Sequence, residues 1–195
     1  MSIIKTKSRG INLADNFAFT GTVSGAGIDE IDQWELPTSF DDGSTAIADI
    51  NTWQRASAAT STKIGIGMTM DANGIFSFPK TGVWIIKLDT MYVGSSSSPD
   101  DPSLGVKIYS STDAFASQQS TIGTAVTSMN YFGSANMYVG AHATVIFNCT
   151  NISTHKIRFK TDSVDSDNSP SAIDVLGVAG DIHTGILFQR VGNAQ

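Results

Sequence analysis

Apolar and polar side chains alternate along much of the chain, which is the pattern of half-buried β-strands. The clearest case is residues 83–93, where β-branched and aromatic side chains also favour a strand over a helix. Successive side chains of a strand point to opposite faces, so one face of this segment is apolar. The side chains expected to pack in the core or between subunits are Trp84, Ile86, Leu88, Tyr92 and, from a later strand, Phe188.

A second alternating segment covers residues 138–148. One of its phases contains Val139, Ala141, Ala143, Val145 and Phe147. Turn sequences separate the segments, and Asp71-Ala72-Asn73-Gly74 between apolar flanks predicts a tight hairpin. The further candidate strands are residues 63–70, 74–78, 104–109, 156–160 and 184–191.

Roughly eight short strands separated by turns predict an all-β sandwich, jelly roll or barrel. Strands and helices do not alternate, which argues against an α/β architecture. The only helix candidate is residues 47–59, where Ile47, Ile50 and Trp53 are three residues apart. The same segment is equally compatible with an irregular strand.

The first 45 residues differ from the rest, because they are rich in Gly, Asp, Ser and Thr and have scattered apolar residues. We expect residues 1–45 to form an extended N-terminal attachment arm and residues 46–195 to form the β domain. The arm either covers an edge of its own domain or docks on another subunit or protein. Its expected anchors are Ile11, Leu13, Phe17, Phe19 and Val23.

The charge of the chain argues against nucleic-acid binding. The net charge is −6 and the isoelectric point is about 4.8, whereas phosphate contacts need clustered Lys and Arg. The basic residues Lys156, Arg158 and Lys160 alternate with apolar ones and predict the solvent face of a strand. No stretch approaches the roughly 18 apolar residues of a membrane span, and no secretory signal is visible. We therefore expect no nucleic-acid or membrane partner and synthesis in a cytoplasm.

Catalytic motifs are missing from the sequence. It contains no Gly-x-Ser-x-Gly, no phosphate-binding Gly-rich loop and no His-Glu-x-x-His. The single cysteine, Cys149, shares its phase with Val145 and Phe147, which predicts a buried, inert thiol. Glu30 and Glu35 leave a paired-carboxylate glycosidase site open as an alternative. We expect a protein that is not an enzyme and has no cofactor.

Two further groups have a possible binding role and a simpler structural interpretation. Acidic side chains at short spacing can gather oxygen ligands for calcium, but the simpler interpretation is a solvated loop. The acidic residues in question are Asp162, Asp165 and Asp167. Aromatic rings can stack on sugars, but more often they pack in a core or an interface. The rings in question belong to Trp34, Trp53 and Tyr131.

Residues 71–86 resemble the signature of the complement globular-head and tumour-necrosis-factor-like jelly rolls. Their pattern is Gly-x-Phe-x-x-Pro-x-x-Gly-x-Tyr, and here Gly74, Phe76, Pro79, Gly82 and Trp84 occupy its positions, with Trp in place of Tyr. The resemblance covers residues 48–192, with a weak match over residues 110–135. It implies an eight-stranded jelly roll in which Pro and Gly shape the turn into a long core strand. It also implies a homotrimer.

Residues 8–23 resemble an N-terminal motif of virion structural and tail-fibre-like proteins of marine bacteriophages. That motif runs here from Ser8-Arg9-Gly10-Ile11-Asn12-Leu13 to Val23. The resemblance implies a particle component, located in the virion and assembled in the cytoplasm of a host bacterium.

Together these features predict a non-enzymatic virion structural protein, namely a trimeric capsid decoration (cement) protein. Its partners would be copies of itself and other virion proteins, either the major capsid protein or the tail. One alternative is a tail fibre or knob whose loops, residues 95–102 and 162–171, contact the host. Another is a carbohydrate-binding β module.

Overall fold

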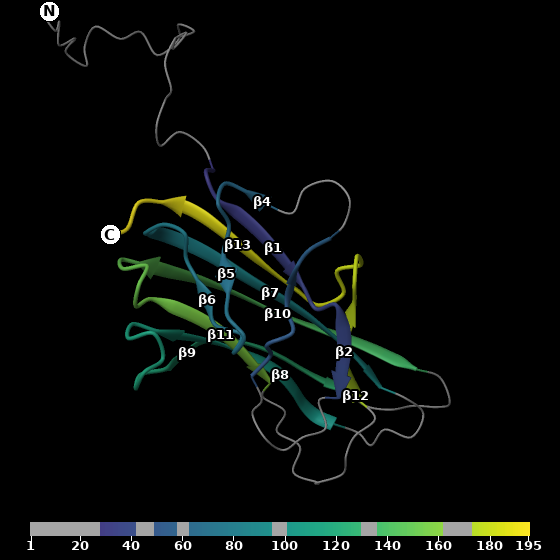
Figure 1. Cartoon of the computed structure of the whole chain (residues 1–195). Helices are drawn as coiled ribbons and strands as arrows, with labels where there is room; N and C mark the ends of the chain where they lie inside the picture. The colour runs from purple at the N-terminus through teal and green to yellow at the C-terminus, as the bar shows by residue number, and fades with distance from the viewer. Residues whose placement is uncertain (1–27, 42–48, 58–62, 95–100, 130–135, 162–172) are drawn as a thin grey trace, which may run out of the picture.

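The fold is a sandwich of two antiparallel β-sheets (Figure 1). A computed structural model describes residues 28–41, 49–57, 63–94, 101–129, 136–161 and 173–195. Within these ranges the chain forms thirteen strands and no helix. Among the described residues there is therefore no helix that is long and apolar enough to span a membrane. The expected all-β fold is confirmed.

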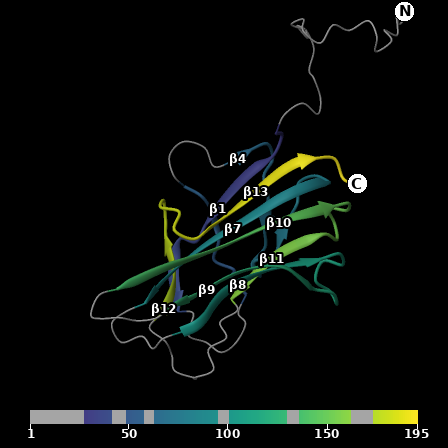
Figure 2. The ribbon, with the colours of Figure 1, turned by 180° about the vertical axis from the view of Figure 1, so that it is seen from behind.

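The larger sheet has eight strands, and four of them lie side by side in the order β10, β7, β13, β1 (Figure 2). β7 pairs with β10 along its whole length, with β13 over most of its other edge, and with β12 near its C-terminal end. The eight strands are β1 (Ile31–Glu35), β2 (Thr38–Asp41), β3 (Gln54–Arg55), β4 (Lys63–Ile64), β7 (Gly82–Gly94), β10 (Met137–Cys149), β12 (Ile173–Val178) and β13 (Gly185–Gly192).

The smaller sheet has five strands in the order β5, β6, β11, β8, β9. These are β5 (Thr69–Met70), β6 (Phe76–Ser77), β8 (Asp101–Ser111), β9 (Ser120–Met129) and β11 (Lys156–Thr161). Eight strands alternate between the sheets as in a jelly roll, with β1, β13, β7 and β10 in one sheet and β6, β11, β8 and β9 in the other. The expected jelly roll of roughly eight strands is confirmed, and five further strands extend its sheets.

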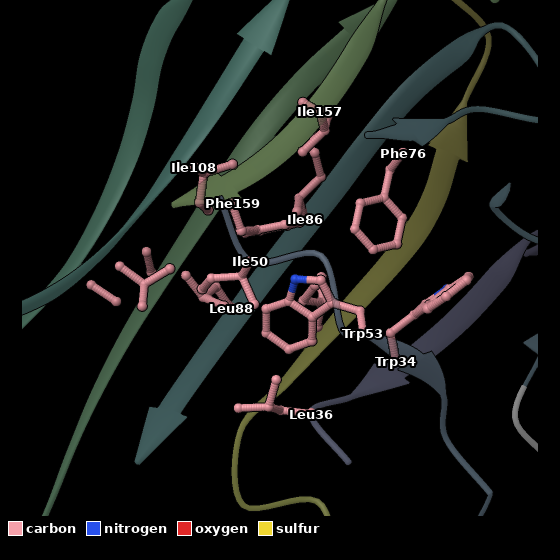
Figure 3. Close-up of a cluster of buried hydrophobic side chains, with 14 of the residues drawn as sticks. Trp34, Leu36, Ile50, Trp53, Phe76, Ile86, Leu88, Ile108, Ile157 and Phe159 are labelled. Atoms are coloured by element: carbon pink, nitrogen blue, oxygen red, sulfur yellow. The ribbon is translucent and has the colours of Figure 1, made fainter. Parts of the chain in front are cut away.

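The sandwich interior holds the apolar phases that alternate in the sequence. Trp84, Ile86, Leu88 and Tyr92 of β7 are fully buried, as is Phe188 of β13. Figure 3 shows Ile86 and Leu88 in this core together with aromatic rings from both sheets. Each fully buried side chain of this size stabilises the fold by about 1.5–3 kcal/mol. The core, rather than the outer surface, therefore contains all five of these predicted packing residues.

The predicted hairpin at residues 71–74 connects β5 to β6. Asp71 caps it, because its Oδ1 accepts hydrogen bonds from the Asn73 and Ile75 amides at 2.9 and 3.0 Å. Gly74 has a φ of 75°, a conformation that other residues rarely adopt. The turn residues thus determine the hairpin, as expected.

Residues 63–70 do not form the single strand that their sequence predicts. Gly65 and Gly67 have φ values of 81° and 80°, which are incompatible with an extended strand. They divide the segment into β4, which belongs to the larger sheet, and β5, which belongs to the smaller one. The helix candidate at residues 47–59 likewise contains no helix where it is described, and β3 lies within it.

The expected arm, residues 1–45, differs from the structure at its C-terminal end. Residues 31–41 form β1 and β2, and β1 pairs with β13 over its full length. Trp34 and Leu36 belong to the core. The sandwich therefore includes residues 31–41, and the apolar anchors expected between Ile11 and Val23 lie outside the described residues.

Candidate functional site

The outward face of the larger sheet has exposed apolar side chains. In β10 one phase points into the sandwich and the other points away from it, as predicted. On the outward phase, Ile146 is 75% exposed and Tyr138 is 58% exposed. Exposed apolar side chains mark an interface when they belong to a contiguous apolar surface.

The strand registers connect these side chains into rows across the sheet. Ile146 of β10 is opposite Ile85 of β7, and Ile85 is opposite Gln189 of β13. Gln189 is in turn opposite Ile31 of β1. The row therefore crosses four strands, and three of its four side chains are isoleucines.

Polar side chains lie next to this row on the same face. The Lys87 ammonium lies 2.8 Å from an Asp89 carboxylate oxygen, and both side chains are about half exposed. His142 of β10 is opposite Asp89 and is exposed. This outward face thus combines an apolar row with charged groups of both signs, which is compatible with an interface that has an apolar centre and a polar rim.

Three buried carboxylates on or next to β1 attach loops to the larger sheet. Asp32 is 1% exposed and accepts hydrogen bonds from Arg55 Nε and Nη2 at 2.8 and 3.0 Å. It also accepts them from the Trp34 indole at 2.9 Å and from the Met68 amide at 2.6 Å. A carboxylate with this many donors is satisfied by structural contacts, and we assign it to stability.

Glu30 and Glu35 have the same kind of role. The Glu30 carboxylate lies 2.8 Å from the Lys80 ammonium and accepts a hydrogen bond from the Gly67 amide at 3.0 Å. Glu35 accepts hydrogen bonds from Gln54 Nε2 at 2.7 Å and from the Gly180 amide at 3.0 Å. Each therefore connects β1 to a distant segment of the chain.

The alternative of a paired-carboxylate site at Glu30 and Glu35 finds no support in this geometry. Burial alone would raise the pKa of both carboxyls, but their hydrogen bonds outweigh burial, and both pKa values are lowered. A general acid in glycoside hydrolysis needs a raised pKa. Glu30 directly precedes β1 and Glu35 ends it, five residues later. Because successive side chains of a strand alternate between its faces, these two point to opposite faces of the sheet.

Cys149 is fully buried at the end of β10. Burial raises the pKa of its thiol to about 11, so the reactive thiolate is scarce at neutral pH. His142 lies on the opposite, exposed face of the same strand. The predicted buried thiol is confirmed.

The remaining predicted binding residues are either buried or outside the described ranges. Trp34 and Trp53 lie in the core and offer no ring face for a sugar. Tyr131 lies outside the described residues, as do Asp162, Asp165 and Asp167. In the part of the chain that the structure describes, no three His, Cys, Asp or Glu side chains gather as they would around a metal ion.

Solved structures with a similar fold include three from the tumour-necrosis-factor-like group. Eiger TNF from S. frugiperda is 11% identical with a TM-score of 0.56, and the match covers 86% of this chain and 95% of that one. Murine APRIL at pH 8.0 is 12% identical with a TM-score of 0.54, covering 83% of this chain and 98% of that one. The same protein at pH 8.5 gives 13% and 0.52 with the same coverage.

No protein-family model matches the chain, and no curated protein matches its sequence. The structural likeness therefore shows the fold alone, and it extends over most of the chain and nearly all of each similar structure. It confirms the resemblance of residues 48–192 at the level of the fold: the chain has a tumour-necrosis-factor-like jelly roll.

Proposed function

We propose that this protein is a non-enzymatic, homotrimeric component of a bacteriophage particle that decorates the capsid. The observation that carries the proposal is the row of outward-facing isoleucines on the larger sheet, in which Ile146 is exposed and Ile85 and Ile31 are partly buried. The residues 8–23, which resemble a phage virion motif, support the location in a particle.

Trimer formation would bury the row that contains Ile146, Ile85 and Ile31. Burying one such side chain contributes about 1.5–3 kcal/mol, and each of three copies would contribute its own row. Homo-oligomers with closed rotational symmetry satisfy every copy of such a face and leave none exposed. The jelly-roll fold, which the first resemblance associates with trimers, is consistent with this assembly.

Attachment to the particle is assigned to the N-terminal segment. Its apolar residues Ile11, Leu13, Phe17, Phe19 and Val23 would be buried on the shell or on a neighbouring subunit. Three copies on one trimer bind together, so the effective affinity of the trimer greatly exceeds that of one segment.

The test has two measurements on the same purified protein. Light scattering should give a mass near three times 20.6 kDa for the full chain. A variant without residues 1–24 should still have the mass of three copies of its shortened chain, since the first described strand begins at Ile31, and it should no longer bind particles. A monomeric full chain contradicts the trimer, and a truncated protein that still decorates particles contradicts the role of the N-terminal segment.

Copy number tests the location. Decoration requires hundreds of copies per particle, which quantitative gel densitometry against the major capsid protein can measure. A count of a few tens or fewer would contradict decoration of the capsid.

A further inference from the structure

A polar pocket lies on the outward face of the smaller sheet, between β11 and the connection from β8 to β9. Its volume is about 370 Å³, within the range of small-molecule sites. Hydroxyl and amide side chains form much of its wall. The lining residues are Phe115, Ala116, Ser117, Gln118, Gln119 and Arg158.

Arg158 is the charged group of this pocket, and its side chain is 18% exposed. Its guanidinium carbon lies over the Phe115 ring, 4.4 Å from the ring centre, in a cation–π contact. Nη2 donates a hydrogen bond to the Gln119 side-chain oxygen, and Nη1 lies 3.6 Å from an Asp49 carboxylate oxygen. Nε is buried and has no acceptor among the described residues.

The unpaired Nε indicates what kind of ligand would complete the site. Nε and Nη2 form one side of the guanidinium, and their spacing matches the two oxygens of a carboxylate. Gln119 supplies a single oxygen, so it satisfies one of these two donors and leaves the other unsatisfied. A ligand carboxylate that replaces the Gln119 oxygen would satisfy both.

The loop that carries Phe115 is held in place before any ligand arrives. Asp113 accepts hydrogen bonds from the Ser117 amide at 2.8 Å and from the Gln118 amide at 3.0 Å. Ala114 and Phe115 have φ values of 59° and 62°, which are uncommon for residues other than glycine. Strained backbone of this kind concentrates at functional sites.

The surrounding surface favours an anion. Lys156, Arg158 and Lys160 share the outward face of β11, as their alternation predicts, and Lys107 is opposite Lys160 on β8. Asp49 and Asp113 offset part of this charge, since Asp49 lies 3.2 Å from the Lys160 ammonium and the Asp113 carboxylate accepts hydrogen bonds from Ser117 and Gln118 of the pocket loop. In a chain with a net charge of −6, this concentration of cations on one face attracts acidic ligands.

We propose that this pocket binds an acidic sugar, with the sugar carboxylate on Arg158 in place of the Gln119 oxygen and the ring hydroxyls on the polar side chains of Ser117 and Gln118. Uronic acids and sialic acids share this chemistry. The site lies on the smaller sheet, away from the outward face of the larger sheet, so it does not depend on the proposed trimer or on attachment to a particle.

The ligand test uses the full-length protein labelled with ¹⁵N and titrated with glucuronate, with N-acetylneuraminate, with glucose and with acetate. Both acidic sugars, or one of them, should shift the resonances of residues 115–119 and saturate. Glucose lacks the carboxylate and acetate lacks the ring, so each should bind at least ten-fold more weakly. If acetate binds as tightly as the acidic sugars, the site recognises only an anion and the proposal is overturned. The proposal is also overturned if neither acidic sugar saturates the site.

Variants test the assigned geometry. Arg158→Lys retains the charge but loses the two-pronged donor, and it should weaken binding at least ten-fold. Gln119→Ala frees Nη2 and should leave binding unchanged or tighter. Lys63→Gln removes one positive charge from the larger sheet and should have no effect. Unchanged binding by Arg158→Lys overturns the proposal. A loss of binding by Gln119→Ala also overturns it, so the test remains decisive if the Arg158 variant does not fold.

Discussion

Gly82 lies at the start of β7, where the chain leaves the Pro-Lys-Thr turn. A Cβ atom at this position would lie 2.6 Å from the Gly192 carbonyl oxygen and would also collide with the Arg190 side chain. The carbonyl belongs to the paired strand β13, so the backbone of one of the two strands would have to shift to admit the added atom. The glycine of the jelly-roll signature is therefore required by a close approach of two strands.

We expect Gly82→Ala to lower the free energy of unfolding by about 2 kcal/mol, within the usual range for steric strain in a packed structure. Urea denaturation at a fixed protein concentration measures this difference. Gly192→Ala is the matched control, because a Cβ atom at Gly192 meets nothing within 4 Å. Equal effects of the two substitutions would contradict the steric explanation.

Asp113 is the residue whose ionisation the structure changes most clearly at the surface. Hydrogen bonds from the Ser111 and Ser117 hydroxyls, with two backbone amides, lower its pKa from 3.8 to about 2. A lowered pKa in the folded state means that the charged form supports the loop above pH 3.8, and this support disappears as the pH falls through about 2.

An NMR titration of the Asp113 carboxyl should therefore have its midpoint near pH 2. Ser117→Ala removes one of the donors and should move the midpoint upward, toward 3.8. A midpoint near 3.8 in the unmodified protein would show that the loop of residues 111–118 is not held as described.

At the scale of the element, β1 is attached to the rest of the sandwich by ionic contacts as well as by its backbone. Asp32→Asn removes the charge that Arg55 requires and should lower the free energy of unfolding by about 3 kcal/mol. This value is at the lower end for a broken buried pair, because Arg55 is one-third exposed. Asp181→Asn is the control: its side chain is 70% exposed beside His183, and we expect a change within about 0.5 kcal/mol. Thermal or urea unfolding that ranks the two variants equally would contradict the assignment.

The long strands β7 and β10 could be predicted from the sequence, whereas β1 and the ten-residue β9 could not. β7 and β10 have apolar residues or glycine at every inward position except Thr90, so their alternation predicts both the strand and its buried face. In β1 a charged residue, Asp32, occupies an inward position, and its partner Arg55 is visible only in the folded chain. For this reason the sequence pattern assigned all of residues 1–45 to the arm, including the residues that form β1 and β2.

The pocket at Arg158 was beyond sequence analysis for a related reason. The alternation of residues 156–160 correctly placed Arg158 on an outward face. Phe115 and Gln119 come from a different connection in the chain, and only the pairing of β11 with β8 brings them next to Arg158. Contacts between such distant residues leave no periodic signal.

At the scale of the whole molecule, the outward face of the larger sheet is the proposed trimer interface. We expect Ile146→Arg to reduce the mass measured by light scattering from three times 20.6 kDa to one, because a buried charge in each interface has no partner. Ile152→Arg is the control, since this exposed isoleucine lies in the turn between β10 and β11. Loss of the trimer in both variants, or in neither, would contradict the assigned interface.

The pairing of β1 with β13 also has a consequence for how the protein acquires its structure. Ile31 is opposite Gln189, so the edge of the larger sheet joins two segments from nearly opposite ends of the described chain. Contacts over such long sequence separations close late and slow the search for the native state. During translation, β1 leaves the ribosome many seconds before its partner does, at typical elongation rates of about 5–20 residues per second. The jelly roll therefore cannot close before β13 has emerged, and until then β1 and β7 each have an edge without its partner strand.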